Sequence, residues 1–113
     1  MPTYMTNDEF VRQFKMLKDE LSSDYSREDS GNSVMALIKE LQLDNRQKLL
    51  MNKIIGAVLA DTIYTILLGL DGCASIGDIQ QPYKIYTKDG KPIDGAEDIE
   101  SCAWKYFHNH DGI

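Results

Sequence analysis

The stretch DNRQKLLMNKIIGAVLADTIYTILLGL, residues 44–70, constrains the fold of this chain more than any other feature. It is the longest and most apolar segment of the 113 residues. Asp44 followed three residues later by Gln47 has the form of a capping box, in which each side chain bonds a free backbone N–H of the other residue. A long helix is therefore expected from about Asp44 to Leu70.

The polar and apolar faces of this helix change places along its length. With residues about 100° apart around the axis, the first half places a polar and small set opposite an apolar set; these are Asn45, Lys48, Asn52 and Gly56 against Leu50, Met51, Ile54 and Ala57. From Asp61 onward, the side that was polar carries the apolar residues Ile63, Ile66, Leu67 and Leu70. The side that was apolar now carries Asp61, Thr62, Thr65 and Gly69. The changeover predicts a central helix that is covered on different sides along its length. A break or kink near Gly56 or Asp61 would give the same pattern.

The same segment is a poor candidate for a membrane span. Ile54 to Leu70 is 17 residues, at the short limit for a span, and Asp61 in its middle would cost roughly 2.5–3.5 kcal/mol on insertion scales. We therefore expect a core helix and no membrane association. Asp61 is then the expected partly buried polar residue, either hydrogen-bonded to a neighbouring element or Thr65, or placed at a cleft.

Three further helices and a small hairpin are expected around this helix. A helix is predicted from about Asn7 to Leu21, with Thr6 and Glu9 as its capping box. A second is predicted from Val34 to Leu43, capped by Asn32 or Ser33. A third is predicted from about Ala96 to Phe107, where Asp94 and Glu97 form the cap. Residues 22–32 are predicted as a loop, and Tyr83–Thr87, Asp89-Gly90 and Lys91–Ile93 as a β-hairpin. The predicted fold is mainly α, a compact four-helix arrangement around a long central helix, with residues 1–113 as one domain.

Composition restricts the class of partner. The chain has 18 acidic and 12 basic residues and a formal charge of −6, which argues against direct nucleic-acid binding and favours a basic protein partner. The beginning MPTYMTNDEF has neither the basic nor the apolar region of a signal peptide, so a cytoplasmic location is expected. Cys73 and Cys102 do not have metal-site spacing and are expected as free thiols.

No catalytic or metal-binding motif is evident. No serine or cysteine has a general base at a recognisable spacing. The glycines of residues 69–77 do not form a phosphate-binding motif, and Asp71 and Asp78 are not part of a calcium loop. His108, His110 and Asp111 are metal-binding residue types, but a solvated tail is the favoured interpretation. We therefore expect no enzyme activity, no metal and no cofactor.

A small acidic protein without a catalytic motif is typical of an inhibitor or immunity-type protein that neutralises a basic partner such as a nuclease toxin. The candidate contacts are the acids and tyrosines outside the predicted core, although a solvated loop and helix capping also explain many of them; they are Asp19, Glu20, Asp24, Tyr25, Glu28, Asp29, Tyr83, Tyr86, Asp94, Glu97, Asp98 and Glu100.

Two alternative functions remain open. The first is a small enzyme or ligand-binding domain with its site near residues 69–78, where Asp61, Asp71 or Asp78 would act as acid or base. The second is a homo-oligomeric structural protein, a homodimer for example, that buries spare apolar surface of the central helix against its own copy.

Overall fold

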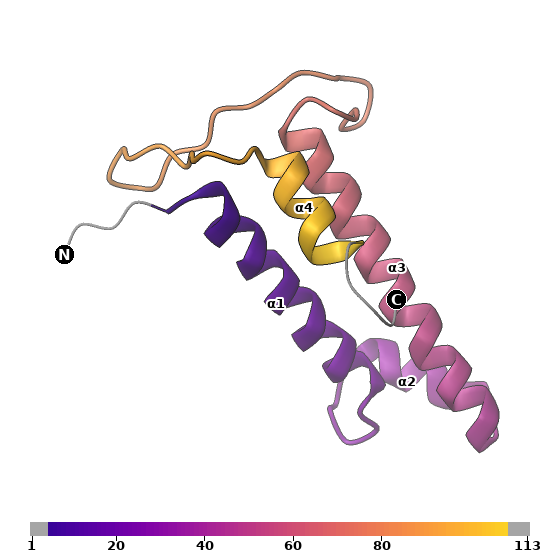
Figure 1. The fold of residues 1–113 in the computed structure, drawn as a ribbon. Coiled ribbons are helices and arrows are strands. Elements are labelled where there is room, and N and C mark those ends of the chain that lie inside the picture. Colours follow the sequence, from indigo (N-terminus) through magenta and orange to yellow (C-terminus); the bar gives the residue numbers. More distant parts are fainter. Residues whose placement is uncertain (1–4, 109–113) are drawn as a thin grey trace.

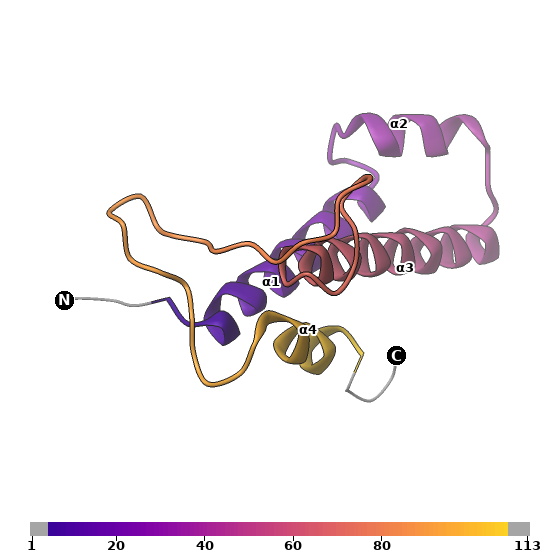
Figure 2. The same cartoon turned by 90° about the horizontal axis from the view of Figure 1, so that it is seen from above.

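The computed structural model describes residues 5–108, and this part of the chain contains four helices. They are α1 (Asn7–Ser26), α2 (Ser33–Glu40), α3 (Asn45–Leu70) and α4 (Ile99–Phe107). The helices α1 and α3 run beside each other, α4 packs at the C-terminal half of α3, and α2 lies near the other end (Figure 1). Seen from above, α2 and α4 are on opposite sides of α3 (Figure 2). The mainly helical fold around one long helix is confirmed.

The capping box at the start of α3 is present. The Asp44 carboxylate accepts a hydrogen bond from the Gln47 backbone N–H at 2.8 Å, and the Gln47 side chain accepts one from the Asp44 N–H at 2.9 Å. The helix then continues through Gly56 and Asp61 to Leu70. Asp61 is exposed on this helix, so the expectation that it is partly buried is wrong.

The core lies where α1, α4 and the C-terminal half of α3 meet. Val11 of α1, Leu67 of α3 and Cys102 of α4 are fully buried. The rest of this cluster comes from the same three helices and consists of Ile63, Ile99, Ala103 and Phe107. Aromatic side chains cover its edge, among them Phe10, Phe14, Tyr64 and Tyr106. This end of the molecule is therefore closed by its own side chains.

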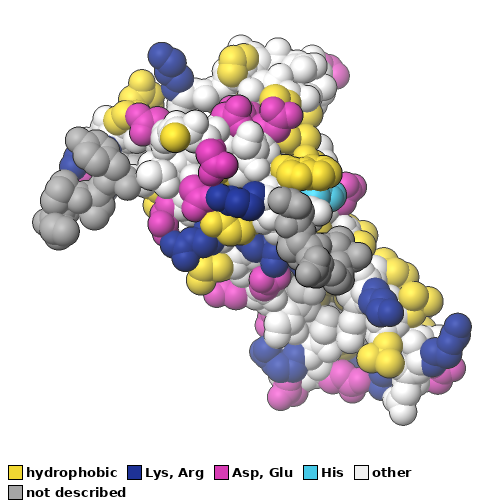
Figure 3. Space-filling view, viewed as in Figure 1, with side chains coloured by type: hydrophobic (Ala, Val, Ile, Leu, Met, Phe, Trp, Pro, Cys, Tyr) yellow, Lys and Arg dark blue, Asp and Glu magenta, His cyan; other side chains and the backbone are white. Residues whose placement is uncertain are grey.

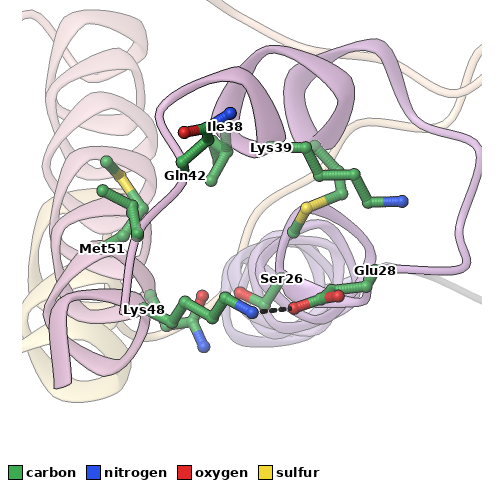
Figure 4. A pocket seen from close by; sticks show the side chains of 10 residues that line it. Ser26, Glu28, Ile38, Lys39, Gln42, Lys48 and Met51 are labelled. Atoms are coloured by element: carbon green, nitrogen blue, oxygen red, sulfur yellow. Dashed lines mark ion pairs between the residues drawn. The ribbon is translucent and has the colours of Figure 1, made fainter. Parts of the chain in front are cut away.

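The other end of the molecule is open. Met35 is the one residue of α2 that is buried, while Leu37 and Leu41 are 65% and 57% exposed. The end of α1, α2 and the start of α3 enclose a hollow of about 220 Å³, with the Glu28–Lys48 ion pair across it at 2.9 Å (Figure 4). Few apolar contacts hold α2 in place.

In the first half of α3, the predicted inward and outward faces are only partly correct, since Met51 lines the hollow as expected but other residues of both faces do not follow the prediction. Leu50 and Ile54, expected inside, are 52% and 48% exposed. Lys48 and Asn52, expected outside, line the hollow beside α2. Gly56 faces α1, since a Cβ there would lie 3.6 Å from Ser22 Oγ. Close approach of α1 at the small residue thus turns the apolar side of this half outward.

The predicted β-hairpin is not formed. Tyr86 and Pro92 make an isolated antiparallel bridge, and the Gly90 N–H donates to the Thr87 carbonyl in a turn. The Thr87 N–H donates to the Lys91 carbonyl and the Ile93 N–H to the Ile85 carbonyl, both at 2.8 Å, but the pairing ends at this one bridge and forms no ladder. Residues 71–98 instead run as an irregular segment over the end of α3 (Figure 1).

Three helix boundaries differ from prediction. The helix α1 continues to Ser26, so the loop predicted from residue 22 begins later. The helix α2 ends at Glu40, before Gln42, whose φ is 55°. The helix α4 begins at Ile99 with Asp98 as its N-cap, and not near Ala96 after Asp94.

Candidate protein-binding surface

The predicted contact residues fall into two acidic groups at opposite ends of α1. Residues 19–29 are at its C-terminal end. Residues 94–100 are near its start, where the Asn7 N–H donates to the Asp94 carbonyl at 2.7 Å. Because Asp19 follows Asn7 by twelve residues in α1, about 18 Å of helix separates the near ends of the two groups. The fold does not bring them together into one surface.

The group at residues 19–29 is largely neutralised by its own neighbours. Asp19 pairs with Lys15 at 3.0 Å, and Arg27 pairs with both Asp24 and Asp29. The ion pair with Lys48 holds the pKa of the Glu28 carboxyl below its usual range. Glu20 is exposed and Tyr25 is half-buried in the same region. These pairs leave a surface of mixed charge.

The second group is larger than the sequence indicated. The start of α1 and the end of α3 add carboxylates to it, and we call the whole set the acidic face: Asp8, Asp71, Asp94, Glu97, Asp98 and Glu100. Asp71 Oδ2 accepts a hydrogen bond from the Glu100 N–H at 2.9 Å, and Asn7 Nδ2 donates to the Glu97 carbonyl at 2.9 Å. Figure 3 shows acidic side chains gathered over the start of α4.

Hydrogen bonds lower the pKa of two carboxyls of the acidic face, Asp8 and Asp98. Lys105 and Tyr106 donate to the Asp8 carboxylate, and the bond from Lys105 is the main cause that lowers the pKa of Asp8. The backbone N–H of Ser101 does the same for the N-cap carboxyl of Asp98, whose pKa is also lowered. The bond to Asp8 raises the pKa of Lys105, which also contacts Glu97 at 3.3 Å. These hydrogen bonds favour the charged form of the Asp8 and Asp98 carboxyls.

Exposed aromatic side chains adjoin the acidic face. Trp104 is 53% exposed, follows Glu100 by one helical turn, and stacks on the His108 ring at 5.1 Å. Tyr83 and Tyr86 line a shallow hollow of about 280 Å³ together with Asp94. Trp104, Asp8 and Asp71 were not predicted as contacts from the sequence. For Trp104 a signal was available, because residues four apart on a helix, such as Glu100 and Trp104, are neighbours on its surface.

Two side-chain clusters have metal-site spacing. Ligand atoms of Asp71, Cys73 and Glu100 lie within 4.8 Å of one another, as do those of Asp8, Glu97 and Cys102. Desolvation is the main cause that raises the pKa of both thiols, which disfavours the thiolate that binds a metal. In addition, Asp8 and Glu97 already bind Lys105. Hydrogen bonding accounts for both clusters. His110 and Asp111 lie outside the described residues.

Two of the proposed acid–base residues, Asp61 and Asp71, do not converge. They are ten residues apart along and just beyond α3, a separation of about 15 Å. Asp78, the third, is exposed. The hollow beside α2 contains Met35, Ile38 and Met51 with the Glu28–Lys48 pair (Figure 4). Its volume of about 220 Å³ is below the range of about 300–1,000 Å³ that is usual for ligand pockets.

No family model, curated protein or solved structure matches this chain. The geometry and charge of its surfaces are therefore the basis for assigning a function.

Proposed function

We propose that this chain is a non-enzymatic inhibitor or immunity-type protein that binds a basic protein, and that the contact is made by the acidic face and Trp104. The observation that carries the proposal is the gathering of carboxylates at the start of α1, the end of α3 and the start of α4, with Trp104 exposed one helical turn after Glu100. A field of one sign speeds the encounter with an oppositely charged partner. Tryptophan is the residue type most often found at the energetic centre of an interface.

The local charge balance supports the acidic face over the group at residues 19–29. In that group, lysines and arginine already bind Asp19, Asp24, Glu28 and Asp29. On the acidic face, Asp8 and Glu97 share Lys105. Asp71, Asp98 and Glu100 make no ion pair with another described residue. A basic partner would find more uncompensated charge at the start of α4.

The test measures binding to a set of purified basic nucleases and to the product of the gene adjacent to that of this chain. Trp104→Ala should weaken the Kd about 30-fold, the equivalent of a hot-spot loss of about 2 kcal/mol. Glu100→Gln should act mainly through a slower association rate and a weaker salt dependence. Glu20→Gln, an exposed acid in the other group, is the matched control and should change neither.

Absence of salt-sensitive binding to every one of these proteins would overturn the proposal. So would binding that Glu20→Gln weakens as much as Glu100→Gln, because the contact would then not be at the acidic face. Circular dichroism of each variant checks that the helices are intact.

A further inference from the structure

The outer side of α3 carries an exposed stripe that no other described element covers. Its members recur at spacings of three and four residues and wind gradually around the helix axis. They are Leu50, Ile54, Ala57, Val58, Asp61, Thr62, Thr65 and Ile66. The four largest, Leu50, Ile54, Val58 and Ile66, are 45–57% exposed. The stripe extends for about 24 Å, at about 1.5 Å per residue.

Charges are placed symmetrically about the middle of this stripe. Lys53 precedes Ala57 by four residues, and Asp61 follows it by four. Both charged residues are exposed, and neither makes an ion pair with another described residue. The small side chain of Ala57 would allow another backbone to approach closely at the centre. This arrangement is complementary to itself when the helix is turned end for end.

We propose that the part of the stripe from Leu50 to Asp61 binds a second copy of this chain, with the two α3 helices antiparallel and crossing at Ala57. In this dimer Lys53 of each copy faces the partner's Asp61, so the two-fold axis creates the same ion pair twice. Leu50 and Ile54 are covered at the same time. The dimer leaves α4 on the outside, so it is independent of the function proposed for the acidic face.

The charges also favour a second copy over a lipid bilayer. The helix α3 is long and apolar enough to cross a membrane, with a mean hydropathy of 1.7 over 18 residues of which 17% are buried. However, Lys53 and Asp61 both lie on the side that would face lipid. A carboxylate there would cost roughly 2.5–3.5 kcal/mol. In the proposed dimer, the Asp61 carboxylate instead faces the Lys53 ammonium of the second copy.

The test is the molar mass of the full chain, measured by light scattering after gel filtration, with charge-reversal variants. The unmodified chain should show twice its 12.8 kDa mass. Lys53→Asp and Asp61→Lys should each weaken the dimer at least about tenfold, because like charges then face each other twice. The double variant should regain the dimer, and an equal mixture of the two single variants should form a mixed dimer.

Two further variants fix the crossing point. In a Cys73→Ser background, Ala57→Cys should form a disulfide-linked dimer when diamide oxidises the thiols. Leu50→Cys should not, because antiparallel packing about Ala57 separates the two Leu50 positions by about 21 Å along the helix. Lys84→Asp and Asp78→Lys reverse exposed charges elsewhere in the chain and serve as matched controls that leave the mass unchanged.

Each other result overturns the proposal. A monomer at tens of micromolar, or single reversals that leave the dimer intact, excludes this interface. Solubility only in detergent, or binding to phosphatidylcholine vesicles, assigns the stripe to a membrane. Efficient linkage through Leu50→Cys indicates a parallel pair.

Discussion

The two halves of α3 differ in what their apolar side chains contact. In the C-terminal half, Ile63 and Leu67 are 8% and 0% exposed and pack against α1 and α4. In the N-terminal half, Leu50, Ile54 and Val58 are about half exposed, while Lys48 and Asn52 face the hollow beside α2. An amphipathic helix normally hides its apolar side. The first half of α3 therefore leaves Leu50, Ile54 and Val58 uncovered by any other described element.

The largest expected effect is a difference in the stability lost when a leucine is truncated in each half of α3. Leu67→Ala removes a fully buried side chain and should lower the free energy of unfolding by about 2–5 kcal/mol. Leu49→Ala, a matched change at a residue that is 66% exposed, should change it by no more than about 0.5 kcal/mol. Urea unfolding of both variants measures the difference. Equal losses would show that the open end is packed as well as the closed one.

A smaller effect should appear where residues 71–98 fold over the closed end. Gly72 has φ 81°, and a Cβ there would lie 2.8 Å from the backbone nitrogen of Pro82. Gly77 has φ 64° with open space around it. Gly77→Ala should lower the free energy of unfolding by about 1–2 kcal/mol because of backbone strain. Gly72→Ala should lower it further, because Pro82 must also move. Thermal unfolding ranks the two variants, and a larger loss at Gly77 would contradict the contact with Pro82.

Hydrogen exchange should show the same contrast within the native protein. Met35 is the one buried residue of α2, whereas α4 contributes Ile99, Cys102, Ala103 and Phe107 to the core. Segments with few buried contacts open with less free energy. The amides of α2 should therefore exchange faster than those of α4, and Met35→Ala should speed exchange in α2 without changing α4. Equal protection of the two helices would remove the distinction between the ends.

The smallest effect concerns acid stability at the closed end. The pKa of Asp8 is lowered in the folded protein, first by its bond with Lys105. Asp8 therefore stabilises the folded protein fully at pH values above its ordinary pKa of 3.8. This stabilisation is lost as the pH falls through the lower pKa of the folded state. Asp8→Asn should lower the urea midpoint at pH 7 and reduce the loss of stability between pH 5 and pH 2. An unchanged acid profile would show that Asp8 gains nothing from Lys105.

The sequence predicted the elements better than their contacts. Side chains that cap helices act locally, so Thr6, Asn32 and Asp44 were identified correctly. The hairpin prediction failed because the two arms beside the Asp89-Gly90 turn pair only at the isolated bridge between Tyr86 and Pro92. Periodicity showed that α3 has two faces in its first half, but not that Gly56 would let α1 approach the polar one.

The candidate contact surface was predicted in part. Glu97, Asp98 and Glu100 were selected from the sequence, whereas Asp8 and Asp71 join them only through folding, from positions near the beginning of the chain and at the end of α3. Ion pairs such as Glu28–Lys48 link residues far apart in sequence. The charge balance of each acidic group could therefore not be predicted from composition.

The most direct test of the outward apolar face is thiol labelling at increasing protein concentration, in a Cys73→Ser background. The thiol of Ile54→Cys should react rapidly in dilute protein and become protected as the dimer forms. The thiol of Leu67→Cys should be protected at every concentration, because Leu67 is fully buried. Protection of the Ile54 position at every dilution would show that the apolar side faces inward. Rapid reaction at every concentration would show that no second copy covers it.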